Sequence, residues 1–179
     1  RFYRKAQAAG IRPIVGAEVV IEAAGIPGEE GDLQPDHRLR MPAPVGFGRA
    51  AGASWHLTLL ARDIVGYRNL CRLLSRAHVR SHDAFSRITV RDLARCSEGV
   101  IALSGCRNGE IAAAVAAGES ARARCALERL RACFAPGDFY VELVHDLTRD
   151  APHTNAGLIA LADSEDVPIV ATNNVHYVR

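Results

Sequence analysis

Two kinds of hydrophobic pattern alternate along the chain. Short runs rich in β-branched residues predict strands, and stretches whose apolar residues recur every three or four positions predict helices. The strands are expected at 11–21, 55–61, 99–103, 139–144 and 167–171. The helices are expected at 1–9, 66–79, 109–117, 120–134 and 152–163, with a short one from Thr89 to near Cys96. Thr89 and Asp92 have the spacing of a capping box, which starts that short helix. Such alternation is typical of an α/β fold with a mainly parallel sheet or barrel.

The segment from 23 to 54 interrupts this alternation. It holds four of the eight prolines and many of the glycines, and its hydrophobic residues follow no period. We expect a long flexible loop, which in a compact domain is either functional or disordered. The whole chain of 179 residues otherwise suits one domain with its own core.

Composition narrows the class of protein. A hydrophobic content of 49% and a charged content of 23% are ordinary for a globular domain, and a net charge of +2 does not indicate nucleic-acid or membrane binding. The longest apolar run, 111–117, is too short to span a bilayer, and no signal peptide is visible. The cysteines are odd in number and form no CxxC pair, which favours a reduced cytoplasmic protein: Cys71, Cys96, Cys106, Cys125 and Cys133.

Residues with metal-binding chemistry lie in or beside the predicted strands. Glu18 is a lone carboxylate in an apolar run, where it is costly unless it is paired or bound to a cation. His56 opens the second strand, Cys106 follows the third, and Asn174 and His176 follow the last. Carboxylate, imidazole and thiol groups are ligands of zinc and manganese, so the five could form one site. Each also has a simpler explanation, such as an asparagine-rich turn or a surface histidine.

Other polar residues favour structural interpretations. Arg68, Arg72, Arg76 and Arg80 form a stripe that could meet phosphates, but such a stripe is more often a solvated face. His145 is expected to be a surface or hydrogen-bonded histidine, and Glu142 is expected to pair with an arginine. Three cysteines on helical patterns are expected to be small core residues: Cys71, Cys125 and Cys133.

Four sequence blocks together resemble the polymerase-and-histidinol-phosphatase (PHP) domain, and more narrowly the PHP domain of bacterial DNA polymerase III α subunits. They are 10–18 (GIRPIVGAE), 56–70 (HLTLLAR to GYRNL), 103–106 (LSGC) and 171–177 (ATNNVHY). The resemblance covers essentially the whole chain apart from the 23–54 loop. Ser75 to His78 and the NNVHY ending are similar to the error-prone, translesion branch.

The resemblance implies a distorted β/α barrel with a divalent-metal cluster, zinc or manganese, at one end. The ligands of the family fall on Glu18, His56, Cys106, Asn174 and His176. Asn174 stands where the family has Asp, and a neutral amide holds a divalent metal less firmly than a carboxylate does. The remaining family ligands would precede Arg1, so the chain is expected to be a partial PHP domain over 1–179, with a barrel incomplete at its N-terminus. The open edge of such a barrel predicts poor solubility of the isolated piece.

The function that the resemblance implies is part of a DNA-directed DNA polymerase in replication and repair. A complete cluster would perform metal-assisted phosphodiester hydrolysis as a 3′–5′ exonuclease. The polymerase active site would lie beyond Arg179 and would use magnesium. The expected partners are DNA and other replication or translesion-synthesis proteins, with no membrane. Two alternatives stay open: a stand-alone phosphoesterase of the histidinol-phosphatase type, and a structural platform that has lost its metals.

Overall fold

The computed structural model describes residues 2–22, 54–80, 87–145 and 148–173. The strands are β1 (Gly16–Glu22), β2 (Ser54–Ala61), β3 (Arg87–Ile88), β4 (Val100–Leu103), β5 (Phe139–Val144) and β6 (Ile169–Thr172). The helices are α1 (Phe2–Ala8), α2 (Ile64–Arg80), α3 (Val90–Arg95), α4 (Glu110–Ala116), α5 (Ser120–Arg131) and α6 (Ala151–Ser164). The predicted loop at 23–54 lies outside the described residues up to position 53.

The described strands form one sheet in the order β3-β1-β2-β4-β5-β6. Neighbouring strands are parallel except at β2, which runs antiparallel to both β1 and β4. The first residues of β2 therefore lie at the edge of the sheet where β1 and β4 end. The antiparallel direction of β2 is important because it places the first residues of β2 beside the carboxyl ends of β1 and β4.

The two faces of the sheet differ in what covers them. Val19, Leu57, Leu59, Ala102 and Val141 belong to a single apolar core. That core also contains residues of helices α2 to α6, such as Leu73, Leu93, Ile111, Leu127 and Leu158. At the alternate positions, Glu18 is exposed, and His56 and Thr58 are partly buried. Since side chains alternate across a strand, the helices cover one face and the polar residues lie on the other.

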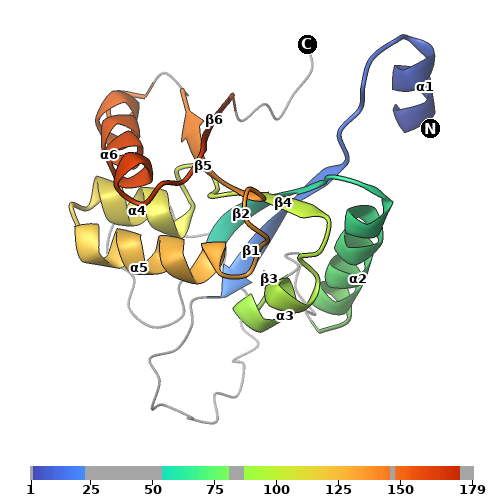
Figure 1. Ribbon diagram of the computed structural model, residues 1–179, viewed down its shortest axis with the longest axis horizontal. Helices are drawn as coiled ribbons and strands as arrows, with labels where there is room; N and C mark the ends of the chain where they lie inside the picture. The colour runs from blue at the N-terminus through green and yellow to red at the C-terminus, as the bar shows by residue number, and fades with distance from the viewer. Residues whose placement is uncertain (1, 23–53, 81–86, 146–147, 174–179) are drawn as a thin grey trace, which may run out of the picture.

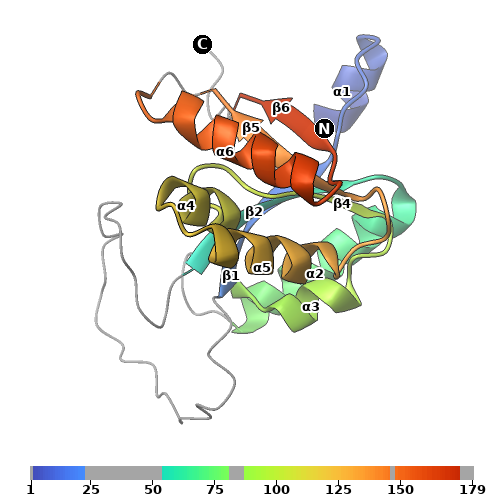
Figure 2. The same cartoon turned by 60° about the vertical axis from the view of Figure 1, so that its left-hand side comes forward.

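The views from two directions show how the helices group. Helices α4, α5 and α6 lie together at the β5–β6 end of the molecule, and α2 and α3 lie together at the β3 end (Figures 1 and 2). Helix α1 projects away from the body in both views, and none of its residues is buried. Among the helices of the described segments, none has the length and apolar character needed to cross a bilayer.

The α/β class predicted from the hydrophobic pattern is confirmed, while closure into a barrel stays a prediction. Strand β5 and the capping box of Thr89 and Asp92 appear as expected. The first predicted strand is too long, because residues 11–15 precede β1 without strand structure. Strand β3 was not predicted, since two residues carry no detectable period.

Some predictions of side-chain burial are wrong and others are confirmed. Cys71 and Cys125 are exposed and not core residues, because they lie on the outward faces of α2 and α5. Arg68, Arg72 and Arg76 are exposed, as a solvated stripe requires, and His145 is exposed as predicted.

Candidate metal centre

Glu18, His56 and Cys106 are brought together by strand register. Glu18 pairs with Thr58, and Val20 pairs with His56, so Glu18 and His56 are diagonal neighbours on the same face of β1 and β2. Cys106 follows β4, which is the other neighbour of β2. One ligand atom from each of the three residues can be chosen so that all three atoms lie within 4.8 Å of one another.

The turn after β4 carries Cys106 to His56. Gly105 has φ +91°, and a Cβ there would lie 2.2 Å from the carbonyl oxygen of His56. Only glycine combines that conformation with so close an approach. The backbone N–H of His56 donates to the carbonyl of Asn108 at 3.1 Å, which fastens the turn to the start of β2.

One ring nitrogen of His56 faces this cluster. Its Nδ1 lies 2.8 Å from Oε1 of Glu18, which is an ion-pair contact when the ring is protonated. The nitrogen is buried and makes no hydrogen bond of standard geometry within the described part of the chain. A cation that takes the place of the proton can bind both atoms.

The Cys106 thiol is buried, with 6% of the residue exposed. Burial raises the pKa of this thiol, the backbone N–H of Asn108 partly offsets the rise, and the negative charges of Glu18 and Glu142 add to it. A bound cation would reverse this effect, because it stabilises the thiolate that coordinates it.

These three residues fit a divalent transition metal. Ligand atoms lie about 2.0–2.3 Å from zinc, so two ligands of one ion are at most about 4.6 Å apart. The three ligand atoms lie within 4.8 Å of one another, which is close to that limit. The mixture of carboxylate, imidazole and thiol suits zinc or manganese better than a hard, all-oxygen cation such as calcium. The other two predicted ligands, Asn174 and His176, lie outside the described residues.

The surroundings of Glu142 differ from the prediction. Its Oε1 accepts a hydrogen bond from the hydroxyl of Thr172 at 2.6 Å, so its partner is Thr172 and not the predicted arginine. Burial raises the pKa of Glu142, the Thr172 hydroxyl lowers it, and the charge of Glu18 raises it further. The sequence signal that could have drawn attention to Glu142 is a carboxylate inside an apolar strand. The same signal singled out Glu18.

Much of the 56–70 block has structural roles. Nη1 of Arg62 contacts both carboxylate oxygens of Asp138 at 2.9 and 2.6 Å, which ties the end of β2 to the start of β5. Gly66 lies against Gly99, where a Cβ would be 1.8 Å from the Gly99 carbonyl oxygen. Buried Asn69 donates to the carbonyl of Glu98 at 2.8 Å. These contacts hold α2 against the sheet.

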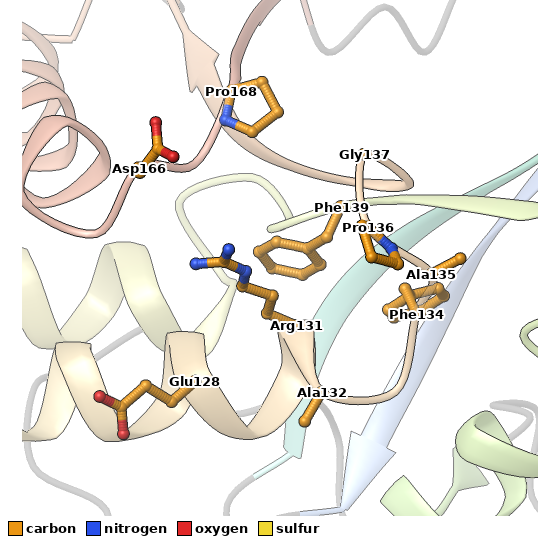
Figure 3. Close-up of a pocket in the computed structure, with 10 residues that line it drawn as sticks. All are labelled: Glu128, Arg131, Ala132, Phe134, Ala135, Pro136, Gly137, Phe139, Asp166 and Pro168. Atoms are coloured by element: carbon orange, nitrogen blue, oxygen red, sulfur yellow. The ribbon is translucent and has the colours of Figure 1, made fainter.

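A separate pocket lies at the opposite edge of the sheet. It is lined by residues around the beginnings of β5 and β6, among them Phe139 and Pro168, with Arg131 and Asp166 at its rim (Figure 3). Because β4, β5 and β6 are parallel, this edge is remote from the residues that follow β4. None of the described residues that line the pocket is a predicted metal ligand.

Comparison with known proteins places the chain in a family. The family model described as the PHP domain matches residues 1–146. The error-prone DNA polymerase of Symbiobacterium thermophilum is 34% identical over 193 residues, covering 99% of this chain and 15% of that protein. The DNA polymerase III α subunits of Thermus aquaticus and Pseudomonas aeruginosa are each 34% identical, covering 99% and 100% of this chain. The chain spans 13% of the length of each of these two α subunits. The chain therefore belongs to the PHP domain family.

Proposed function

We propose that the chain is the PHP domain of a bacterial DNA polymerase of the III α type, of the error-prone kind, and that it removes nucleotides from DNA 3′ ends. The support for the parent protein is that the relatives match over nearly the whole chain and carry polymerase names. The observation that supports the hydrolytic activity is the grouping of Glu18, His56 and Cys106, whose ligand atoms lie within 4.8 Å of one another.

Each of the three residues would contribute a different group to the binding of a cation. Glu18 supplies negative charge, His56 supplies the buried nitrogen, and Cys106 supplies a thiolate from the turn after β4. When zinc or manganese is bound by these residues, it would lower the pKa of bound water and neutralise charge on the scissile phosphate. The two strands and the turn hold the donors in fixed positions, which reduces the reorganisation needed on binding. Magnesium would serve the polymerase reaction elsewhere in the parent protein.

Two alternative functions are a structural platform and a stand-alone phosphoesterase. A structural platform without metals is favoured by Asn174, the neutral residue at the position where the family pattern has Asp. A stand-alone phosphoesterase of the histidinol-phosphatase type is less well supported, because the matching relatives are polymerases of which the chain spans 13–15%. The partners under the leading proposal are DNA and other proteins of replication or translesion synthesis.

Metal analysis of the intact protein tests the proposal. We expect bound zinc or manganese by mass spectrometry, and metal-dependent shortening of a 5′-labelled primer from its 3′ end. His56→Ala and Glu18→Gln should lower metal affinity and shortening at least tenfold, since even outer-shell changes cost about 10–100-fold. His145→Ala, at an exposed histidine, is the matched control and should change neither.

Two results would count against the proposal. Absence of bound metal under zinc and manganese titration would leave the structural platform as the function. Shortening that persists unchanged in His56→Ala and Glu18→Gln would assign the nuclease to another part of the parent protein.

A further inference from the structure

Helix α2 carries positive charge along its outward face. Leu73 and Ala77 face the core, while Arg68, Arg72 and Arg76 are exposed to solvent. These arginines are four residues apart, so they form a row along the helix, which we call the α2 arginine stripe. The helix contains no aspartate or glutamate. Its charged surface is therefore of one sign.

The surroundings of the stripe do not neutralise it. Within the described segments, none of its three arginines makes an ion pair. Arg72 donates at 3.3 Å to the side-chain oxygen of Asn69, which is uncharged. The carboxylate that precedes the helix, Asp63, is already engaged by Arg62 and by the backbone N–H of Gly66. Like charges four residues apart destabilise a helix, and no ion pair among the described residues compensates for this cost.

Helix α5 shows that arginines elsewhere in the chain are neutralised. It also carries four arginines, and each makes a polar contact: Arg122 with Glu119, Arg124 with Glu165, Arg129 with Glu110, and Arg131 with the carbonyl of Glu165. An arginine-rich composition explains why both helices contain arginine. It does not explain why α2 lacks acidic partners, so the stripe is a feature of this helix.

Two further arginines extend the positive surface. Arg91 and Arg95 are exposed on α3, which lies beside α2 in both views (Figures 1 and 2). The acidic residue of α3, Asp92, is 4% exposed and belongs to the capping box with Thr89. Helices α2 and α3 therefore present exposed arginines, and neither helix has an exposed carboxylate. The net charge of +2 for the whole chain conceals this local excess.

We propose that the α2 arginine stripe binds the phosphate backbone of DNA. Guanidinium groups form bidentate hydrogen bonds with phosphates, and a polyanion supplies the negative charge that the helix lacks. At 1.5 Å per residue, the three arginines span about 12 Å along the helix. One DNA strand presents a phosphate about every 3.4 Å of duplex axis, so this length matches roughly three phosphates. Such contacts do not depend on base sequence.

The stripe is separate from the candidate metal centre. Helix α2 packs on the helix-covered face of the sheet, whereas Glu18 and His56 are on the opposite face. The stripe is therefore a second contact with DNA and does not hold a nucleotide at the metal. From the proposed function, the inference takes only that the parent protein acts on DNA. It requires neither a bound metal nor nuclease activity.

DNA binding by the intact protein tests the proposal. The stripe variant is Arg68→Gln/Arg72→Gln/Arg76→Gln, in which all three changes are at exposed positions. Fluorescence anisotropy with two labelled duplexes of unrelated sequence measures affinity at several salt concentrations. We expect the variant to bind both duplexes at least about tenfold more weakly. The slope of log affinity against log salt should become shallower by about 2–3, because each phosphate contact contributes about 0.9.

The control variant removes the same charge from α5, where the arginines are also exposed: Arg122→Gln/Arg124→Gln/Arg131→Gln. It should change neither the affinity nor the salt slope, and thermal melting establishes that both variants are folded. An equal loss of affinity in the control would overturn the proposal, because total charge would then explain the effect.

Two cysteines provide a second measurement that requires no substitution. Cys71 is exposed on α2 between Arg68 and Arg72, and Cys125 is exposed on α5. We expect duplex DNA to slow the alkylation of Cys71 by iodoacetamide severalfold and to leave Cys125 unaffected, as measured by mass spectrometry of the labelled peptides. Equal rates at Cys71 with and without DNA would overturn the proposal even if the stripe variant did not fold.

The remaining outcomes separate this proposal from its alternatives. Unchanged affinity and salt slope in the stripe variant would overturn it. Protection of Cys71 by polyglutamate but not by DNA would assign the stripe to an acidic protein partner. If His56→Ala abolishes primer shortening while the stripe variant keeps its DNA affinity, the nuclease proposal stands and the stripe fails. If the stripe variant loses affinity but the unaltered protein shortens no primer, the stripe stands and the nuclease proposal fails.

Discussion

Gly105 decides whether the Cys106 thiol can reach His56. Its φ of +91° and the 2.2 Å separation between a built Cβ and the His56 carbonyl oxygen exclude any other residue without movement of the turn. Neighbouring Ser104 is 1% exposed and accepts the Glu142 N–H, so the turn after β4 is fixed on both sides. The Ser-Gly-Cys sequence therefore combines one candidate ligand with two residues that position it.

We predict that Gly105→Ala destabilises the protein and weakens metal binding together. Gly118→Ala is a matched control, because Gly118 has φ +72° and a Cβ there meets nothing within 4 Å. The control should cost about 1–2 kcal/mol from backbone strain alone. Gly105→Ala should cost about 1–3 kcal/mol more from overpacking. Chemical denaturation measures both, and equal losses would show that the turn can move away from His56 freely.

The N-terminus of α2 shows how one element is started and held. Asp63 directly precedes the helix, and its Oδ1 accepts the backbone N–H of Gly66 at 2.9 Å. The same Gly66 allows the helix to approach Gly99 of the turn before β4. The start of α2, the end of β2 and the start of β4 are thus fixed within a few residues, and His56 lies on the strand that they hold.

This cap predicts a pH dependence of stability. The hydrogen bond from Gly66 lowers the pKa of Asp63 below its ordinary 3.8, so the carboxylate stabilises the fold above that pH. This contribution of Asp63 to the free energy of unfolding is lost as the pH falls through its lowered pKa. Asp63→Asn keeps a capping oxygen without the charge. We expect the unfolding free energy of the native protein to exceed that of Asp63→Asn at neutral pH. The difference should shrink below pH 3.8; a constant difference across an acid titration would contradict the assignment.

At the scale of the whole molecule, apolar surface and sheet edges remain uncovered among the described residues. Phe2, Ile11 and Ile14 are 80%, 63% and 71% exposed along α1 and the segment leading to β1. Strands β3 and β6 lie at the two ends of the strand order. Exposed apolar side chains and unpaired strand edges are both routes to self-association.

We therefore predict that the 179-residue chain, prepared by itself, associates increasingly with concentration. Light scattering and size-exclusion chromatography measure this association. Replacing Ile11 and Ile14 by Thr should reduce it, because their side chains are exposed and removing them costs no core packing. A Val79→Thr variant, also at an exposed position but on α2, serves as the comparison. A monomer that melts cooperatively at all concentrations would overturn the prediction.

The sequence by itself determined the local elements and the chemistry of the candidate ligands. Hydrophobic period placed β2, β5 and the helices, because apolar side chains must face the core at the repeat of each element. The capping box at Thr89 was readable because it acts on neighbouring backbone groups. Glu18, His56 and Cys106 stood out because side chains with metal-binding chemistry lay in or beside predicted strands.

The tertiary structure decided which of these residues meet. The antiparallel direction of β2 brings His56 to the edge where Cys106 follows β4, and no local pattern encodes the direction of a strand. The burial of Glu142 and its bond to Thr172 also depend on pairing between β5 and β6. Cys71 and Cys125 face solvent for the same kind of reason, since helical spacing defines a face but not what covers it. Contacts between distant segments arise only when the sheet assembles.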